Sequence, residues 1–258
     1  MPGAVVLAAT AALRAGAGKL TIATVKSIAP LVAQAVPEAR VIGLQEKTSG
    51  GVAALAATDL PVKFDAVLIG PGMQDELAAS EFVAAFLPRL HGAKVLLDAS
   101  AMEIMREPRH AHAISPSAVL LTPHCGELAH LTGETKEAIE ADPDGAALSA
   151  AHRWAAVVAL KGATTLIANP SQQLWSHEGG NIGLAVSGSG DVLAGIIAGL
   201  LARGAALEQA AVWGVALHAR AGDRLATRLG PLGYLSREIS TEVPMLMHDM
   251  TPNTHRTP

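Results

Sequence analysis

The sequence contains a single cysteine, Cys125, in 258 residues. One cysteine excludes an internal disulfide and a metal site built from several cysteines, and it suits a reducing cytoplasm. Aromatic residues make up 3% of the chain, although half of all residues are hydrophobic. The core must therefore be built from Ala, Val, Leu and Ile, whose small side chains suit close packing of helices on a sheet.

Positive charge is not in excess, and long apolar runs are missing. Lys and Arg number 19 against 23 Asp and Glu, which gives a formal net charge of −4. Proteins that bind nucleic acid usually carry a basic stripe, so this balance argues against such a partner. No apolar run reaches the ~20 residues that span a bilayer, and the Ala-rich start lacks the basic segment of a signal peptide. We therefore expect a cytoplasmic protein whose partners are small molecules, not nucleic acid or membrane.

Short runs rich in Val, Ile and Leu alternate with longer helical patterns. Several of the runs are apolar throughout, which is typical of parallel strands buried on both faces. The sequence predicts one α/β domain over residues 1–250, with a central, mostly parallel sheet flanked by helices on both faces. The expected strands are residues 20–25, 40–43, 66–70, 94–98, 119–122, 157–160 and 165–168. The expected helices are residues 4–15, 75–87, 127–131, 144–155, 191–202, 207–229 and 237–247, with a break or kink at Pro244 and a flexible tail over 251–258.

Four polar or glycine-bearing turns follow four of the expected strands. They are GPG (70–72), DAS (98–100), TPHCGE (122–127) and KGATT (161–165). Because ligands of open α/β sheets bind beyond the carboxyl ends of the strands, these turns predict one extended site on one edge of the sheet.

Each turn also has an explanation that requires no ligand. GPG is explained by turn formation alone, and Asp98 is better explained as a cap of the next helix than as a metal ligand. A hairpin turn with a solvated lysine explains KGATT as well as a phosphate contact does. His124 could contact a ligand or simply face solvent, and Cys125 is more typical of a small buried residue than of a nucleophile.

The stretch VSGSGDVLAG, residues 186–195, leads from a turn into an apolar helix. Its spacing does not fit a dinucleotide-binding fingerprint, because the third glycine, Gly195, comes two places late. GAGKLT (16–21) does not fit a P-loop either, because leucines stand at two required positions. The helix is apolar on nearly every face and should be deeply buried. Its Gly195 and Gly199 permit another element to approach closely.

The glycines before this helix leave backbone N–H groups free for a phosphate, yet Asp191 follows at once. Asp191 could be a helix cap, a role that contributes about 1 kcal/mol. Ser187 and Ser189 already offer capping hydroxyls, which weighs against that role. A carboxylate about 4 Å from a phosphate costs about 4 kcal/mol at an effective dielectric near 20. A proton taken up during reaction would offset this cost, so we interpret Asp191 as a general base.

Taken in order, GPG, LLDAS, TPHCGE, KGATT and SGSGDVLAGIIAGLLARG resemble the motifs of the ADP- or ATP-dependent NAD(P)H-hydrate dehydratases. These enzymes belong to the ribokinase-like superfamily, and the resemblance runs over residues 1–247. It implies a ribokinase-like α/β domain and a metabolite-repair lyase. That activity would dehydrate the S-epimer of hydrated NADH or NADPH with ADP, or ATP, as co-substrate and release AMP and phosphate. The resemblance also implies a requirement for Mg²⁺ and a homotetramer.

The same resemblance assigns roles to individual residues. Asp191 would be the base on the substrate hydroxyl, and the magnesium ligands are not assigned. Substrate contacts would fall on Ala4, Gly72, His124 and Asp191. Nucleotide contacts would fall on Lys161, Gly162, Ala163, Thr164, Thr165 and Gly190, and the transferring phosphate would meet an anion hole at Gly188, Ser189 and Gly190.

Three departures from the family pattern stand out. An N-terminal strand and a glycine-rich turn are expected to be missing before Met1. Ser100 stands where a second aspartate is common, and Cys125 stands where proline is common. Two alternatives therefore stay open beside the lyase. One is a kinase of the same superfamily acting on a hydroxymethyl-pyrimidine or thiazole alcohol, and the other is a non-catalytic nucleotide-binding module.

Overall fold

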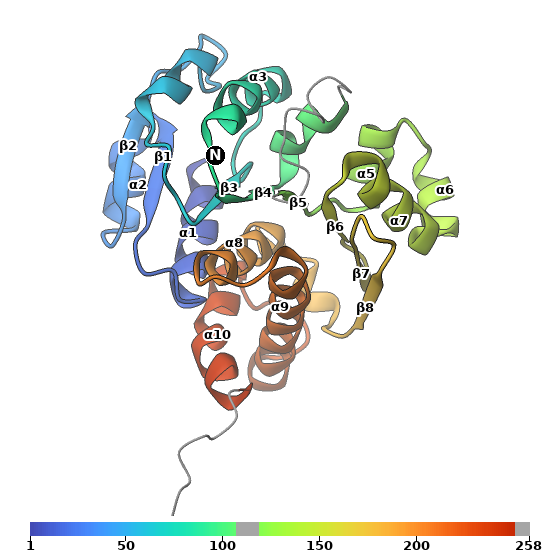
Figure 1. The fold of residues 1–258 in the computed structure, drawn as a ribbon. Coiled ribbons are helices and arrows are strands. Elements are labelled where there is room, and N and C mark those ends of the chain that lie inside the picture. The colour runs from blue at the N-terminus through green and yellow to red at the C-terminus, as the bar shows by residue number, and fades with distance from the viewer. Residues whose placement is uncertain (107–118, 251–258) are drawn as a thin grey trace, which may run out of the picture.

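The computed structural model describes residues 1–106 and 119–250 (Figure 1). The tail expected over 251–258 lies outside the described residues. None of the helices in this part of the chain has both the length and the apolar character needed to cross a bilayer.

The main sheet has six strands in the order in which they occur along the chain. They are β3 (Ala66–Ile69), β4 (Lys94–Leu97), β5 (Val119–Leu121), β6 (Val157–Leu160), β7 (Thr164–Ala168) and β8 (Leu174–Glu178). The first four are parallel, and β7 and β8 continue antiparallel. The predicted mostly parallel sheet is thus confirmed. Strand β8 escaped prediction because its sequence, LWSHE, is half polar.

The two expected strands nearest the N-terminus are not part of the six-stranded sheet. β1 (Thr21–Val25) and β2 (Arg40–Leu44) form a separate parallel pair. Within the described ranges, β2 is the one hydrogen-bonded partner of β1, and no ladder links β1 to β3. Figure 1 shows the pair beside α1 and α2, away from the long sheet. Apolar periodicity predicts strands, but it does not reveal which strands pair.

Alternate residues of the apolar strands serve two different cores, because successive side chains point to opposite faces of a sheet. Leu97 and Leu121 join a cluster that includes Phe82 of α3. Leu96 and Leu120, one position earlier in each strand, pack against α8 and α9 in a second cluster. Burial on both faces explains why these strands read as continuous apolar runs.

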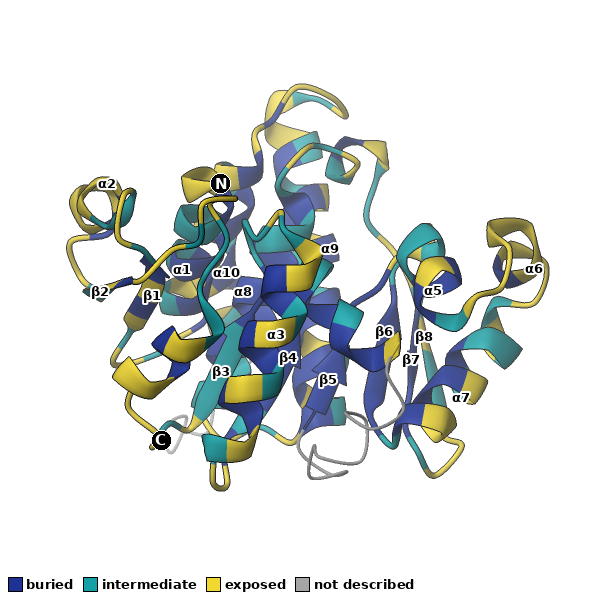
Figure 2. Ribbon diagram, turned by 90° about the horizontal axis from the view of Figure 1, so that it is seen from above, coloured by how far each residue is buried: buried dark blue, intermediate teal, exposed yellow. Residues whose placement is uncertain are grey.

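Helices cover both faces, as predicted, and Figure 2 shows the dark, buried strands β4, β5 and β6 between them. One face carries α3 (Glu76–Phe86), α5 (Cys125–Thr132) and α7 (Pro143–Trp154), and the other carries α8 (Ser189–Ala202) and α9 (Leu207–Leu229). α1 (Pro2–Arg14) and α10 (Ser236–Met250) pack against α8 and α9. The short elements are α2 (Ala29–Ala35), α6 (Lys136–Ala141), η1 (Ala54–Asp59), η2 (Leu87–Arg89), η3 (Ala99–Arg106) and η4 (Ile182–Leu184).

Two expectations about helices have different outcomes. α10 continues through Pro244, so of the predicted break or kink the break is wrong. Val243 and Leu246 are buried on either side of the proline and hold the helix in the core that it shares with α9. The predicted close approach at α8 is confirmed, because a Cβ on Gly195 or Gly199 would lie against backbone oxygens of α1. This packing fixes α8, whose first turn lies at the edge of the sheet.

Candidate active site

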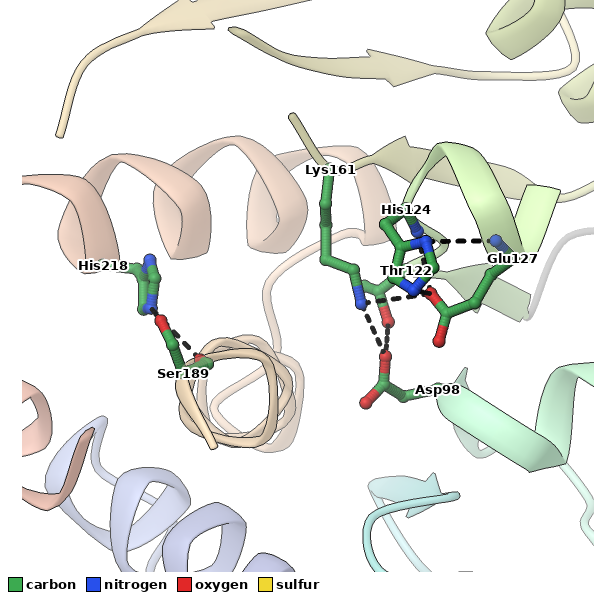
Figure 3. Close-up of polar contacts among 7 residues, drawn as sticks. All are labelled: Asp98, Thr122, His124, Glu127, Lys161, Ser189 and His218. Carbon is green, nitrogen blue, oxygen red and sulfur yellow. Dashed lines mark hydrogen bonds and ion pairs between the residues drawn. The ribbon is translucent and has the colours of Figure 1, made fainter. Parts of the chain in front are cut away.

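A cluster of charged side chains joins the ends of three neighbouring strands. Asp98 follows β4, Thr122 follows β5 and Lys161 follows β6. One oxygen of Asp98, Oδ1, accepts from Thr122 Oγ1 at 2.7 Å and from Lys161 Nζ at 3.2 Å (Figure 3). The predicted cap role of Asp98 is therefore wrong. The side chain is 5% exposed, and a buried carboxylate needs charged or hydroxyl partners more than a helix needs a cap.

The KGATT turn connects β6 and β7, which pair antiparallel with Leu160 opposite Leu166. The hairpin alternative is thus correct for the backbone, but the lysine is not solvated. Lys161 Nζ lies 3.2 Å from Asp98 and 3.6 Å from Glu127. Burial lowers the pKa of Lys161, but the charges of Asp98 and Glu127 outweigh it and leave the pKa above its ordinary value. The ammonium is therefore held as a cation inside the site.

His124 and Glu127 cap the start of α5 reciprocally. His124 Nδ1 accepts from the Glu127 amide at 3.1 Å, and the Glu127 carboxylate accepts from the His124 amide at 2.8 Å. Because Nδ1 is an acceptor, the proton of the neutral imidazole lies on Nε2. Nε2 lies 3.6 Å from Glu127 Oε2, and the side chain is 58% exposed, so the ring stays open to a ligand.

Cys125 begins α5 and packs partly buried against the core below that helix. Burial, and after it the charge of Glu140, raise the pKa of its thiol. A raised pKa disfavours the thiolate, in agreement with the prediction that this cysteine is not a nucleophile.

The first turn of α8 offers backbone donors. Gly188 is the N-cap, with a φ of +86°, and no side chain caps this helix. Within the described part of the chain, the N–H groups of Gly188, Gly190 and Asp191 have no hydrogen-bond partner. The Ser189 N–H, which was expected in the anion hole, is already donated to Val186 O at 3.1 Å. The available donors are thus those of the residues around Ser189.

The capping role expected for the two serine hydroxyls is wrong as well. Ser189 Oγ turns inward and lies 2.9 Å from Nε2 of His218 on α9. The same nitrogen lies 3.2 Å from Ser189 O. Burial, aided by the charge of Lys161, lowers the pKa of His218 to about 4 against a smaller raising effect of the Ser189 backbone. A neutral imidazole therefore anchors the first residue of α8.

Asp191 is the third residue of α8, and its carboxylate has no hydrogen bond or ion pair with any residue that the structure describes. The cap alternative is therefore wrong. Burial, and after it the charge of Asp98, raise the pKa of Asp191 to about 6, although Lys161 and the Met1 amine act in the opposite direction. Such a carboxylate is mostly ionised at neutral pH and still takes up a proton readily, which suits a general base.

The GPG turn is explained by close contact within the chain. Gly70 has a φ of +132°, and a Cβ there would lie against the backbone of Asp98. Gly72 has a φ of +82°, and its carbonyl accepts from the Met1 amine at 2.5 Å. Met1 immediately precedes α1, in which Ala4 is buried. The charge of the Met1 amine acts on Asp191, so this turn and the start of α1 lie on the Asp191 side of the site.

The strand ends and the helix face one another. A Cβ on Gly190 would lie 3.8 Å from Lys161 Nζ, which brings the lysine to the first turn of α8. The structure thus brings Lys161, Gly188, Gly190 and Asp191 together, with His124 beside Glu127 at the margin. Gly162 and Ala163 form the hairpin turn, and Thr164 and Thr165 pair with Glu178 and His177 of β8.

The fold and these motifs agree with comparisons to known proteins. A sequence profile of NAD(P)H-hydrate dehydratases matches residues 1–245. The chain belongs to the NAD(P)H-hydrate dehydratase family. The ADP-dependent (S)-NAD(P)H-hydrate dehydratase of Xanthomonas campestris pv. campestris is 46% identical over 96% of this chain and 84% of its own length.

Other members of the dehydratase family extend the comparison. The crystal structure of the ADP/ATP-dependent NAD(P)H-hydrate dehydratase of Bacillus subtilis, co-crystallised with ATP and Mg²⁺ and soaked with CoA, superposes with a TM-score of 0.84. It is 30% identical over 97% of this chain and 88% of that chain. The bifunctional NAD(P)H-hydrate repair enzyme of Moorella thermoacetica is 35% identical over 97% of this chain. The chain spans 48% of that longer protein.

Sequence reasoning within the dehydratase motifs missed three contributors. Thr122 and Glu127 stand inside TPHCGE, yet only His124 was singled out there. His218 lies on α9, 29 positions from its partner Ser189. The available signal was a histidine among small residues on one face of the helix. Such a histidine is as often solvated as it is part of a site.

The described residues contain one group that could hold a metal ion, formed by Glu76, Glu103 and His130. It is a poor fit for the Mg²⁺ that the dehydratase family implies, because Mg²⁺ prefers oxygen ligands. Glu103 also already bonds His130 at 2.9 Å and Arg106 at 2.8 Å.

Proposed function

We propose that this protein dehydrates the S-epimer of hydrated NADH or NADPH, with ADP as the phosphoryl donor, and releases AMP and phosphate. One observation supports this most strongly. The Asp191 carboxylate, with a pKa of about 6, stands beside backbone N–H groups at the start of α8, and none of these groups has a hydrogen-bond partner among the residues that the structure describes. A base and an anion site are the two parts that phosphorylation of a hydroxyl requires.

In the first step, Asp191 takes the proton of the substrate hydroxyl. The hydroxyl oxygen forms a bond to the β-phosphorus of ADP, and the bond from that phosphorus to the AMP oxygen breaks. The free N–H groups of Gly188 and Gly190 and the ammonium of Lys161 stabilise the charge on the transferring group. Elimination then breaks the carbon–oxygen bond of the phosphoester and a carbon–hydrogen bond on the neighbouring ring carbon. The proton leaves with the phosphate, and the electron pair of the carbon–hydrogen bond restores the ring double bond. The balance is hydrated NADH plus ADP giving NADH, AMP and phosphate.

The remaining contacts follow the two sides of the site. We place the substrate between Gly72 and Ala4 on one side and the Nε2 proton of His124 on the other. We place the nucleotide along Lys161–Thr165, with its phosphates at Gly190. Mg²⁺, held mainly by phosphate oxygens and water, would neutralise charge on the transferring phosphate.

The direct test mixes the purified protein with hydrated NADH, Mg²⁺ and either ADP or ATP, and follows the return of reduced-nicotinamide absorbance. We expect absorbance to return with stoichiometric AMP and inorganic phosphate when ADP is supplied. Reactions without nucleotide or with the Asp191→Asn variant are the controls. If the absorbance does not return with either nucleotide, although calorimetry shows that the nucleotide binds, the proposed lyase activity is rejected.

The same assay separates the alternatives. A stable phosphoester of an alcohol, with no phosphate release, would indicate a kinase of the superfamily, and nucleotide binding without turnover would indicate a binding module. A cytoplasmic location and a homotetramer remain predictions from the single cysteine and from the family. Sedimentation of the purified protein would test the tetramer.

A further inference from the structure

The proposed reaction leaves one buried charge without a role, that of Asp98. The residue is 3% exposed, and its Oδ1 accepts from both Thr122 and Lys161. A buried carboxylate costs several kcal/mol unless it is paired and hydrogen-bonded, because water solvates it far better than protein does. An apolar residue at this position would stabilise the core more than a buried carboxylate does, so stability alone does not explain Asp98.

Two residues next to Asp98 have unusual backbone features. Ala99 has a φ of +48°, in the left-handed region that costs a non-glycine residue about 1–2 kcal/mol. Gly70, on the neighbouring strand end, lacks the Cβ that would collide with the Asp98 backbone. The backbone next to Asp98 thus carries strain at Ala99 and lacks a side chain at Gly70, where the Asp98 backbone packs closely. Strain of this kind gathers at functional sites.

The ammonium that Asp98 holds lies at a particular place. Lys161 Nζ has Asp98 at 3.2 Å on one side and Glu127 at 3.6 Å on another. It faces Gly190, where an added Cβ would lie 3.8 Å away. A lysine side chain has four rotatable bonds and loses about 2 kcal/mol of rotamer entropy when it is fixed, so it needs anchors to stay in one position. Asp98 is the nearer and more buried of the two anchors.

We propose that Asp98 is a positioning residue, whose carboxylate, oriented by Thr122, holds the Lys161 ammonium against Gly190 where the transferring phosphate would arrive. The proposal rests on the proposed function for the identity of that phosphate. Asp98 itself contacts neither the phosphate nor the hydroxyl, and it acts through Lys161. When the Lys161 ammonium binds a phosphate, the Asp98 carboxylate remains as a negative charge near Asp191.

Asp98 and Lys161 act on Asp191 in opposite directions. The charged groups that face Asp191 are Asp98 from the end of β4, Lys161 from the end of β6 and the Met1 amine ahead of α1. His218, on α9, is neutral because burial lowers its pKa to about 4. Asp98 raises the pKa of Asp191, whereas Lys161 and the amine lower it. Replacing Asp98 and replacing Lys161 must therefore shift the titration of Asp191 in opposite senses.

The test compares Asp98→Asn with Lys161→Met by NMR of the whole chain, without turnover. The Asn variant keeps an oxygen for the Thr122 hydroxyl but loses the charge. We expect the ¹⁵N signal of the Lys161 ammonium, sharp in the wild type, to be lost in Asp98→Asn through faster exchange with water. We expect the carboxyl titration of Asp191 to move to lower pH in Asp98→Asn and to higher pH in Lys161→Met.

Turnover supplies a second readout. Asp98→Asn should lower kcat at least tenfold while the affinity for ADP and Mg²⁺ changes less than threefold, because a loosened lysine still binds phosphate but holds it poorly for transfer. Thr122→Val should reproduce part of the loss in kcat, and Thr122→Ser, which keeps the hydroxyl, should restore it.

Two results would overturn the proposal. One is a Lys161 ammonium signal that persists in Asp98→Asn together with an unmoved Asp191 titration. The other is an equal loss of kcat and ADP affinity, which a general structural defect produces. If Asp98→Asn does not fold, two measurements still test the proposal. They are the shift of the Asp191 titration to higher pH in Lys161→Met and the kcat values of Thr122→Val and Thr122→Ser. If the wild type does not turn over, the lyase fails, whereas the NMR measurements still test the positioning.

Discussion

The two sides of the site are built differently. On the strand side, Asp98, Thr122 and Lys161 are tied to one another by side-chain bonds. On the helix side, backbone N–H groups of the first turn of α8 and the Asp191 carboxylate have no partner within residues 1–106 and 119–250. The Ser189 side chain turns away to His218. The strand side therefore holds the Lys161 ammonium in place, whereas the groups of the helix side are free to react with a ligand.

The largest effect should come from the reacting carboxylate. Asp191→Asn should lower kcat by about 10²–10⁴, the usual contribution of a general base, and change ADP affinity little. The exposed Asp59→Asn is the matched control and should keep full activity. Steady-state kinetics and calorimetry measure both quantities. Retained turnover in Asp191→Asn would remove the base.

The backbone donors of the helix side can be displaced without touching a charge. A Cβ on Gly188 would lie 2.5 Å from Leu7 Cδ1, and its φ is +86°. Gly188→Ala should therefore shift the first turn of α8 and lower kcat about tenfold to a hundredfold, within the range that a lost anion-hole donor costs.

Gly204→Ala is the control for Gly188→Ala. Its φ is +100° with open space around it, so it carries similar backbone strain far from the site. Both variants should lose about 1–2 kcal/mol of unfolding free energy, but only Gly188→Ala should lose turnover. Equal losses of turnover would show that strain alone, and not the anion site, matters.

An unbonded carboxylate should cost stability. Because the pKa of Asp191 rises from 3.8 to about 6 on folding, its charged form is disfavoured in the native state. The cost is absent below the unfolded pKa, grows as the pH rises from 3.8 to about 6, and is constant above that. Asp191→Asn should therefore be more stable than wild type by about 1–2 kcal/mol at neutral pH, after allowance for partial exposure.

Denaturant unfolding at several pH values would measure this difference. The gap between Asp191→Asn and wild type should close as the pH falls to the unfolded pKa of 3.8. A gap that stays constant with pH would mean that packing of the amide, and not the titration of Asp191, causes it.

The inward anchor of the helix side should contribute less. Ser189→Ala removes the hydroxyl that contacts His218 and leaves the contact with Ser189 O. Loss of one hydrogen bond should lower the unfolding free energy by about 1 kcal/mol, and kcat should fall about threefold, less than in Gly188→Ala. Thermal unfolding and kinetics check this order, and a kcat loss equal to that of Gly188→Ala would make the hydroxyl itself a phosphate contact.

The smallest effect concerns Cys125. The pKa of its thiol is raised, and the cysteine is free of any disulfide. Cys125→Ala should change kcat less than twofold. A large loss would give the thiol a role that neither its burial nor its pKa supports.

Local pattern predicted what local physics determines. Runs such as VLL and VVAL are apolar because both faces of their strands are buried, and the apolar helix after GSGD is buried for the same reason. The meeting of the four turns at one edge followed from parallel strands. These inferences gave the main sheet and the meeting of Asp98, Thr122 and Lys161 at its edge, whereas the role of Asp191 stays a prediction.

The failures come from contacts between distant positions. Asp98 reads locally as a cap, but its partners lie 24 and 63 positions away. Ser189 reads as a capping hydroxyl, but His218 of another helix captures it. The separation of β1 and β2 from the main sheet depends on strand pairing, which no single run of residues encodes.

A crystal of Asp191→Asn with ADP, Mg²⁺ and hydrated NADH tests the account most directly, since the variant should bind all three without turning over. We expect the β-phosphate within hydrogen-bond distance of the Gly190 N–H and the Lys161 ammonium, and the ring hydroxyl within reach of the side-chain amide introduced at position 191. Phosphate bound elsewhere, or a ring hydroxyl directed at Asp98 or Glu127 and away from position 191, would contradict it.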